Sequence, residues 1–242
     1  MIRSQKKLNE VSAPVETLSS EESFIVGSKN ALSWFEENRM KVFVGVGIVI
    51  VAVAGFFLWQ SNSAADEEKA SVMLSRIVPA YQSSNWRVAI DGDMNSRIQG
   101  EPVRGLKEVV SQYGSTRSGN MAKLYLANAY YFLGKLDSAQ QIFESVDAGE
   151  SLVKASVNAG KAAIFEEKGN KEEAAKLFMS AAGMDKTNPL NADYSLSAAR
   201  NFEQAGKKDE AVKLYKTIIA EYSGGYFDDA AKRGLIRLQV DL

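Results

Sequence analysis

An uncharged apolar run of eighteen residues, from Val42 to Trp59, constrains this chain more than any other feature of its sequence. As an α-helix the run is roughly 27 Å long at about 1.5 Å per residue, close to the ~30 Å thickness of a bilayer's hydrocarbon core. The alternative is a core helix or core strand of a soluble protein, but such an element rarely stays apolar on every face for about five turns. Trp34 on one flank and Phe57 and Trp59 on the other suit the two membrane interfaces. We therefore expect a transmembrane helix over residues 42–60.

The flanks of this run predict a retained anchor and its orientation. Residues 63–65 (Ser-Ala-Ala) have the small side chains that a signal peptidase prefers, but forty-one residues precede the run, far more than in an ordinary signal peptide. Arg39 and Lys41 lie directly before it, whereas acidic residues 66–68 follow it. Because Lys and Arg favour the cytoplasmic side of a span, we expect a cytoplasmic N-terminus and a C-terminal domain across the membrane.

Composition excludes several function classes. Lys plus Arg (29) and Asp plus Glu (30) nearly balance, so the chain lacks the basic field that nucleic-acid binding needs. Cysteine and histidine are both absent, which removes thiol chemistry, the usual general base and the commonest metal ligand. We predict that the protein is not an enzyme and takes no cofactor, metal or small-molecule substrate.

One acidic segment resembles a metal site in part. Asp91-Gly-Asp93-Met-Asn95 has the spacing that begins an EF-hand calcium loop. However, Ser96 stands where the loop needs glycine, and Pro102 stands where it needs the bidentate glutamate. We therefore interpret the segment as an Asp-Gly turn.

The residues before the apolar run divide into two segments. Residues 1–27 are mostly polar, contain Pro14 and are predicted to be a disordered cytoplasmic tail. Residues 28–41 hold Leu32, Trp34 and Phe35 among charged residues and are predicted to form a juxtamembrane helix. A cytoplasmic docking motif is the alternative for that second segment.

After the apolar run a helical pattern repeats three times. The first copy has Ala127, Tyr130, Gly134, Ala139 and Phe143; the second has Ala162, Phe165, Gly169, Ala174 and Phe178; the third has Ala199, Phe202, Gly206, Ala211 and Tyr215. In each copy the small residues allow two helices to approach, the glycine makes the turn, and the aromatic residues fill the contacts. The three crossing alanines are 35 and 37 residues apart, so this pattern resembles the tetratricopeptide repeat, whose period is about 34 residues.

We therefore predict an all-α fold, with one transmembrane helix followed by an α-solenoid over residues 64–242. Its expected parts are a divergent first repeat (64–119), repeats at about 120–153, 155–189 and 192–225, and a capping helix (227–240). In the first repeat, helices are expected at 67–82 and 102–113, with an inserted loop at 83–101. Trp86, Val88 and Ile90 alternate in that loop, which predicts an extended segment that either packs on the repeats or contacts a partner.

The tetratricopeptide resemblance implies a partner-binding groove on the concave face, formed by the first helix of each repeat. Its candidate residues are Leu124, Asn128, Tyr131, Phe132, Glu166, Arg200 and Glu203. Some relatives hold a peptide carboxylate with Lys and Asn, but here Asn128 alone fits and Leu124 replaces the Lys. The mixed face suits an extended or helical segment of another protein. Each of these side chains can equally serve repeat packing.

The whole layout resembles bacterial inner-membrane proteins related to the ancillary subunit of the Sec translocon. The resemblance covers residues 30–242 and includes residues 34–38 (Trp-Phe-Glu-Glu-Asn) and the link at 113–122. It implies a periplasmic repeat domain that binds translocon subunits, chaperones or exported chains, with one helix in the lipid bilayer. The alternative is a structural or assembly subunit of another membrane or envelope complex.

Overall fold

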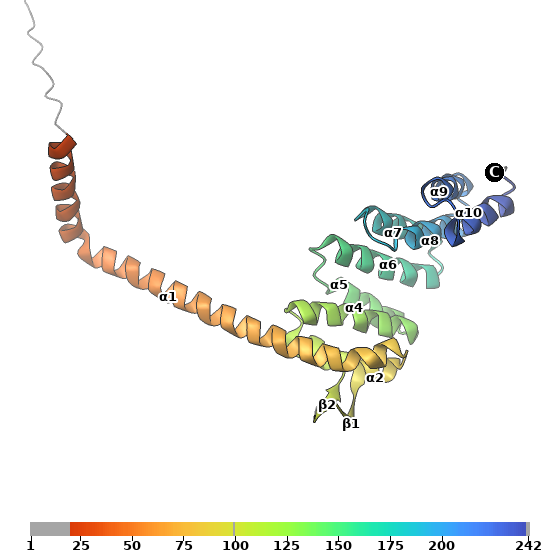
Figure 1. The fold of residues 1–242 in the computed structure, drawn as a ribbon, viewed down its shortest axis with the longest axis horizontal. Helices are drawn as coiled ribbons and strands as arrows, with labels where there is room; N and C mark the ends of the chain where they lie inside the picture. Colours follow the sequence, from red (N-terminus) through yellow and green to blue (C-terminus); the bar gives the residue numbers. More distant parts are fainter. Residues whose placement is uncertain (1–19, 99, 241–242) are drawn as a thin grey trace, which may run out of the picture. The chain divides into compact units, whose positions relative to one another are not determined.

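The computed structural model describes residues 20–98 and 100–240, with the side chains of residues 33–56, 60–98 and 100–240. The chain divides into two compact units, Met1–Ser61 and Asn62–Leu242, which we describe separately (Figure 1). Helix α1 (Ser20–Gln82) belongs to both units and is 63 residues long. It contains the predicted juxtamembrane, membrane and first-repeat helices as one element.

The start of α1 corrects the predicted tail of residues 1–27, because residues 20–27 are helical. The rest of that predicted tail, residues 1–19, lies outside the described residues. Ser20-Glu21-Glu22 favours this start, since acidic residues stabilise the N-terminal turn of a helix.

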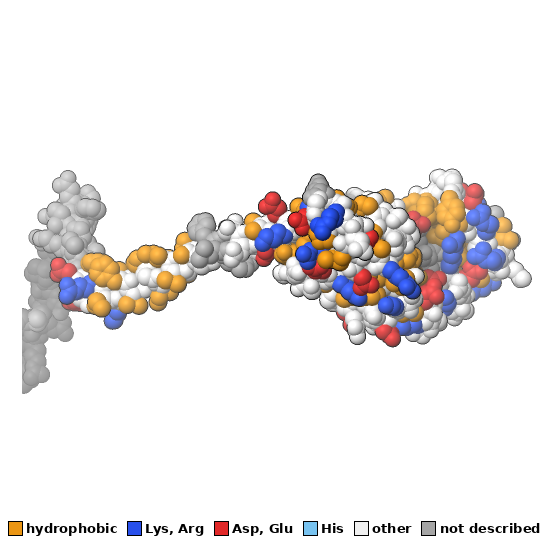
Figure 2. Space-filling model, turned by 90° about the horizontal axis from the view of Figure 1, so that it is seen from below, with side chains coloured by type: hydrophobic (Ala, Val, Ile, Leu, Met, Phe, Trp, Pro, Cys, Tyr) orange, Lys and Arg blue, Asp and Glu red, His pale blue; other side chains and the backbone are white. Residues whose placement is uncertain are grey.

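Among the described residues, α1 is the one helix that is long and apolar enough, by length and composition, to cross a membrane. The side chains of its apolar run are exposed, for example Phe43 (62%) and Val51 (73%). Figure 2 shows hydrophobic side chains along this part of α1, next to a group of charged ones. A core helix of a soluble protein would bury such side chains, so their exposure favours a membrane span over a core helix.

The second unit is a series of helices interrupted by one small sheet. After α1 come α2 (Trp86–Asp91), strands β1 (Gly92–Ile98) and β2 (Glu101–Arg104), α3 (Leu106–Tyr113), α4 (Arg117–Phe132), α5 (Leu136–Glu144), α6 (Ser151–Glu167), α7 (Lys171–Gly183), α8 (Asn191–Gln204), α9 (Lys208–Glu221) and α10 (Tyr226–Arg237). Helices α4/α5, α6/α7 and α8/α9 form three hairpins that follow one another (Figure 1). The predicted solenoid of helical hairpins is confirmed.

The three hairpins use the same turn. Gly134, Gly169 and Gly206 have positive φ angles of 72°, 80° and 75°, a conformation that glycine adopts without a steric cost. The crossing alanines of the sequence pattern are buried completely in all three hairpins. Close helix crossing therefore explains why the pattern needs small residues.

Aromatic side chains fill the contact between the first and second hairpins and the contact between the third hairpin and helix α10. A Cβ atom on Gly160 of α6 would lie 2.1 Å from Cζ of Phe143 in α5. In the same way, a Cβ atom on Gly234 of α10 would lie 2.4 Å from Cζ of Tyr215 in α9. These two rings occupy the space that the glycines leave open, so each of the two interfaces depends on an aromatic ring packed against a glycine.

The inserted segment of the first repeat differs from the prediction in two ways. Trp86, Val88 and Ile90 lie in helix α2 and not in an extended segment. A short helix suits the sequence because Ala89 and Ile90 are both buried in the core cluster that Trp86 also packs against. The packing interpretation of Trp86 is thus the one that the structure shows.

The second difference is a two-stranded antiparallel sheet within the otherwise all-α fold. The predicted helix over 102–113 begins at Leu106 because β2 pairs with β1, with Gly92 opposite Arg104 and Ile98 opposite Glu101. A Cβ atom on Gly105 would lie 2.3 Å from the Ile90 carbonyl oxygen. This close backbone approach requires glycine at position 105.

Helix α1 is fastened to the first standard hairpin through Glu67. Its carboxylate accepts hydrogen bonds from the Ser118 backbone N–H at 3.0 Å and the Ser118 hydroxyl at 2.6 Å. Burial acts to raise the pKa of Glu67, but the hydrogen bonds from Ser118 outweigh it and hold the pKa below its usual value. The negative charge also lies at the N-terminal turn of α4, where the helix dipole favours it.

Candidate partner-binding surface

The predicted groove residues lie mainly near the C-terminal ends of α4, α6 and α8, the first helices of the three hairpins. Tyr131, Glu166 and Glu203 each stand three residues before a turn glycine, and each carbonyl accepts a hydrogen bond from that glycine. They are therefore equivalent positions of the repeat. Their different side chains give each hairpin its own chemistry at the same place.

The first hairpin presents an aromatic patch, which we define as Trp86, Tyr131 and Phe132. Phe132 is 56% exposed, although it is a large apolar side chain. Its ring stacks on Trp86 of α2 with centroids 4.7 Å apart, and Tyr131 meets it edge-on at 5.4 Å. Exposed aromatic rings held rigidly by neighbours are the side chains that most often anchor a protein interface. The sequence identified Phe132 and Tyr131, but it did not show that Trp86 supports them.

The second hairpin places acidic residues beside this patch. Burial raises the pKa of the Tyr131 hydroxyl, and the negative charges of Glu167 and Glu166 add to the increase. The Glu166 carboxylate makes no hydrogen bond or ion pair with any described residue. In the third hairpin Arg200 is exposed and makes no ion pair within the described part of the chain, but its positive charge helps to lower the pKa of Glu203. Phe132, Tyr131, Glu166 and Arg200 together form what we call the recognition strip.

Leu124 does not belong to this strip. Its side chain is buried, with 7% exposure, and packs in one core cluster with Ala127, Phe143 and Val157. The reason is its place in the N-terminal half of α4, where this cluster covers it. A substitution of Leu124 would therefore act mainly on the stability of the fold. This burial corrects the prediction that Leu124 is a groove side chain.

Glu203 is also used inside the protein. Arg237 of α10 donates to both carboxylate oxygens at 2.8 Å, and the Tyr215 hydroxyl donates to Oε2 at 2.6 Å. The hydrogen bond from Arg237 holds the pKa of Glu203 below its usual value, against the effect of burial. Because both oxygens are occupied, Glu203 fastens the capping helix and is not free to receive a partner.

Asn128 is a half-buried residue of α4 in the first hairpin. Burial raises the pKa of Tyr81, while a hydrogen bond from Asn128 works against that increase. The amide that the carboxylate-binding relatives would use therefore lies close to Tyr81, near the C-terminal end of α1. This contact weakens the case for a carboxylate clamp at Asn128.

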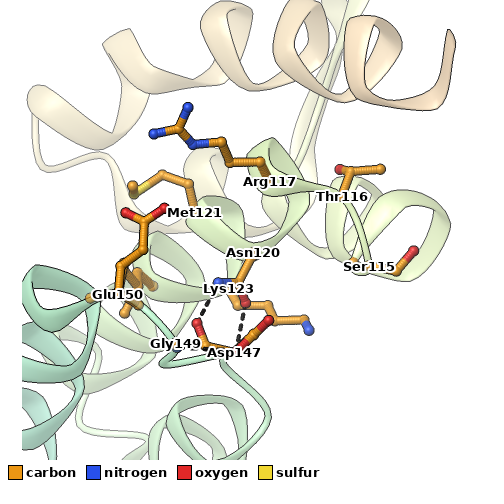
Figure 3. Close-up of a pocket in the computed structure, with 12 residues that line it drawn as sticks. Ser115, Thr116, Arg117, Asn120, Met121, Lys123, Asp147, Gly149 and Glu150 are labelled. Carbon is orange, nitrogen blue, oxygen red and sulfur yellow. Dashed lines mark hydrogen bonds between the residues drawn. The ribbon is translucent and has the colours of Figure 1, made fainter. Parts of the chain in front are cut away.

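A separate pocket of about 610 Å³ lies at the N-terminal ends of α4 and α6 (Figure 3). Asn120 donates to the Asp147 carbonyl and accepts from the Asp147 backbone N–H, both at 2.8 Å, and Lys123 donates to the Ser145 carbonyl at 3.0 Å. These bonds tie α4 to the link between α5 and α6. Through these hydrogen bonds Asn120, within the 113–122 segment, helps to join the first hairpin to the second.

Comparison with known families decides the classification. A family model described as a tetratricopeptide repeat-like domain matches residues 32–193, and a tetratricopeptide repeat model matches residues 193–224. The chain belongs to the tetratricopeptide repeat-like family. No curated protein and no solved structure matches it at a significant level.

Tetratricopeptide repeats generally mediate binding to other proteins, and proteins built from them are typically scaffolds without catalytic activity. The described residues contain no group of three or more His, Cys, Asp or Glu that could hold a metal ion. Of the acids in the calcium-loop-like segment, Asp91 pairs with Lys107 at 2.6 Å, and Asp93 accepts hydrogen bonds from Asn95 and Ser96. Those carboxylates stabilise the tetratricopeptide fold locally around β1.

Proposed function

We propose that this protein is a membrane-anchored interaction module whose recognition strip binds a segment of another protein. The observation that carries the proposal is the strip itself, in which an exposed aromatic residue, an acid and a base occur on successive first helices, the acid and the base without an ion pair among the described residues. Such a surface complements a segment with an apolar side chain, a basic side chain and an acidic side chain in order. The aromatic patch would supply most of the affinity, and the charges would supply orientation.

The proposed place of action is the bacterial inner membrane, with α1 as the anchor, the N-terminus in the cytoplasm and the repeat unit in the periplasm. The apolar run and the flanking Arg39 and Lys41 support this orientation. An anchor raises the local concentration of the repeat unit at the membrane, so a modest affinity suffices. Exported chains or chaperones near the Sec translocon are the proposed partners, on the resemblance of residues 34–38 and 113–122.

The test is copurification of the tagged full-length protein from membranes in mild detergent. The test variant carries Phe132→Ala, Glu166→Gln and Arg200→Gln. The matched control carries Tyr226→Ala, Glu150→Gln and Arg117→Gln, which change an exposed aromatic residue, an exposed acid and an exposed base away from the strip. Translocon subunits or chaperones recovered with the wild type and the control, but lost with the test variant, support the proposal.

A second candidate is an assembly subunit of another membrane complex, and the β1–β2 hairpin favours it. Met94 is 62% exposed and Ile98 is 38% exposed on this small sheet. A complex that survives the strip variant but dissociates on Met94→Ser with Ile98→Ser would replace the first proposal with this one.

A further inference from the structure

Helix α10 presents one face that no described element covers. The helix packs on α8 and α9 through buried small and apolar residues. The opposite side carries four exposed residues that we call the outer stripe: Tyr226, Asp229, Arg233 and Ile236. Tyr226 is 60% exposed and Ile236 is 61% exposed. Two large apolar side chains this accessible on one helix face indicate a contact surface.

The spacing of the outer stripe is that of a coiled-coil seam. Its residues follow one another at intervals of three, four and three positions. This alternation keeps one line of side chains directed at a partner helix. The stripe has an apolar residue at each end and two opposite charges between them. It therefore fits a second helix that lies along α10 and carries the same kinds of residue.

The order of these side chains selects a second copy of α10 in the antiparallel direction. Positions 226 and 236 are equally distant from position 231, and so are 229 and 233. In an antiparallel pair centred there, Tyr226 lies opposite Ile236 and Asp229 lies opposite Arg233. A parallel pair would set Asp229 against its own copy and Arg233 against its own copy, and like charges in contact are unfavourable. The antiparallel pair also has the two-fold symmetry that is commonest between identical chains.

Both charges of the outer stripe are available for such a pair. Neither the Asp229 nor the Arg233 side chain makes an ion pair or a hydrogen bond within the part of the chain that the structure describes. The helix that carries them is fastened, since Arg237 donates to the Glu203 carboxylate at 2.8 Å. Little further ordering of α10 is then needed when a second copy binds.

We propose that α10 pairs with α10 of a second copy of this chain along the outer stripe. Two Asp229–Arg233 ion pairs lie between two Tyr226–Ile236 contacts in this arrangement. The helix has 12 residues and is about 18 Å long, so the interface is small and the dimer is reversible, with a Kd on the order of 10 μM. The inference does not depend on the proposed function, because the recognition strip lies on α4, α6 and α8.

The first test uses engineered disulfides, because the chain contains no cysteine of its own. Full-length Tyr226→Cys and full-length Ile236→Cys, with tags of different mass, are mixed in detergent and oxidised. We expect a disulfide-linked heterodimer on a non-reducing gel. Mixing Ile236→Cys with Leu152→Cys, which changes an exposed apolar residue of α6, is the matched control and should give no such product.

Each variant alone distinguishes the antiparallel pair from a parallel one. In the antiparallel pair the two copies of position 226 are ten residues apart along the helix axis, roughly 15 Å. A disulfide needs Cα atoms within about 7 Å of each other. Tyr226→Cys alone should therefore give at least about tenfold less disulfide than the mixture. In a parallel pair the two copies of position 226 would be adjacent and would crosslink readily.

The second test exchanges the charges. Asp229→Arg or Arg233→Asp alone should weaken self-association of the full-length protein about tenfold, because each turns both ion pairs into like-charge contacts. The double variant restores opposite charges and should restore the dimer. Asp209→Arg, which changes an exposed acid in the first turn of α9, is the matched control and should behave as the wild type. Analytical ultracentrifugation measures the Kd, and circular dichroism checks that each variant is folded.

Three results would overturn the inference. They are no disulfide in the mixture, equal disulfide in the mixture and in Tyr226→Cys alone, and a dimer whose Kd neither single charge reversal changes. The last result would place the contact between copies elsewhere in the chain. Copurification of a partner reports on the recognition strip alone, so the two proposals fail separately. A photo-crosslinker at position 226 would yield a product of twice the 26.4 kDa chain mass, which differs from a partner bound at the strip.

Discussion

Replacing Glu203 by Ala should loosen the C-terminal end of the repeat unit. In the folded protein its carboxylate receives two hydrogen bonds of 2.8 Å from Arg237 and one of 2.6 Å from the Tyr215 hydroxyl. Tyr215 is completely buried, so the substitution leaves its hydroxyl with one weak contact, 3.4 Å from Arg237. Arg237 is 52% exposed on the side chain, and solvent screens its share of the interaction.

The expected loss is about 2 kcal/mol in the free energy of unfolding, chiefly from the orphaned tyrosine hydroxyl. For a domain of this size, that corresponds to a fall of roughly 4–8 °C in the melting temperature. The assay is thermal unfolding of the full-length protein in detergent, followed by circular dichroism. Glu166→Ala is the matched control, because Glu166 occupies the equivalent position of the preceding hairpin and makes no such bonds. Equal melting temperatures for the two variants would refute this reasoning.

The same network has a pH signature. The hydrogen bond from Arg237 lowers the pKa of Glu203 in the folded state, against burial and together with Tyr215. The stabilisation that the Glu203 carboxylate contributes is therefore fully present above the unfolded pKa of about 4.3. It is lost as the pH falls through the lower pKa of the folded protein. Glu203→Gln should show less loss of stability over that acidic range than the wild type.

Two further predictions concern packing and the fastening of α1. Gly160→Ala should lower the free energy of unfolding by about 1–3 kcal/mol, because the new methyl group overlaps the Phe143 ring. Gly183→Ala, whose new methyl group meets open space, should change that free energy little. Urea unfolding of both variants checks this prediction. Glu67→Gln should cost about 1–2 kcal/mol at neutral pH through weaker bonds to Ser118. Because the pKa of Glu67 is lowered in the folded protein, this cost should shrink as the pH falls from the unfolded value of about 4.3 through the lower folded one. A cost that stays the same from neutral to acidic pH would contradict this prediction.

The hairpins were predictable because their requirements are local and recur in phase. A glycine at each turn, an alanine at each crossing and an aromatic residue at each contact are all visible within one repeat of the sequence. The positive φ angles of Gly134, Gly169 and Gly206 show why those positions repeat. Hydrophobicity alone likewise predicted the apolar stretch of α1.

The remaining features depend on residues far apart in the sequence. Glu203 is engaged by Arg237, 34 residues later, and no spacing in a single repeat indicates that pair. The β1–β2 hairpin replaces part of a predicted helix because Val103 is buried where β2 pairs with β1. Leu124 carries the same apolar character in a core or in a groove, so only its packing partners identify its role.

The most direct test of the central claim is site-specific photo-crosslinking in membranes, with a benzoylphenylalanine replacing Phe132 in the recognition strip. Tyr226, an exposed aromatic residue on the capping helix (60% exposed, against 56% for Phe132), is the matched control position. We predict a discrete crosslinked protein from position 132, whose yield falls with Arg200→Gln and which is absent from position 226. No crosslinked protein at position 132, or the same product from both positions, would contradict the claim that the strip binds a partner.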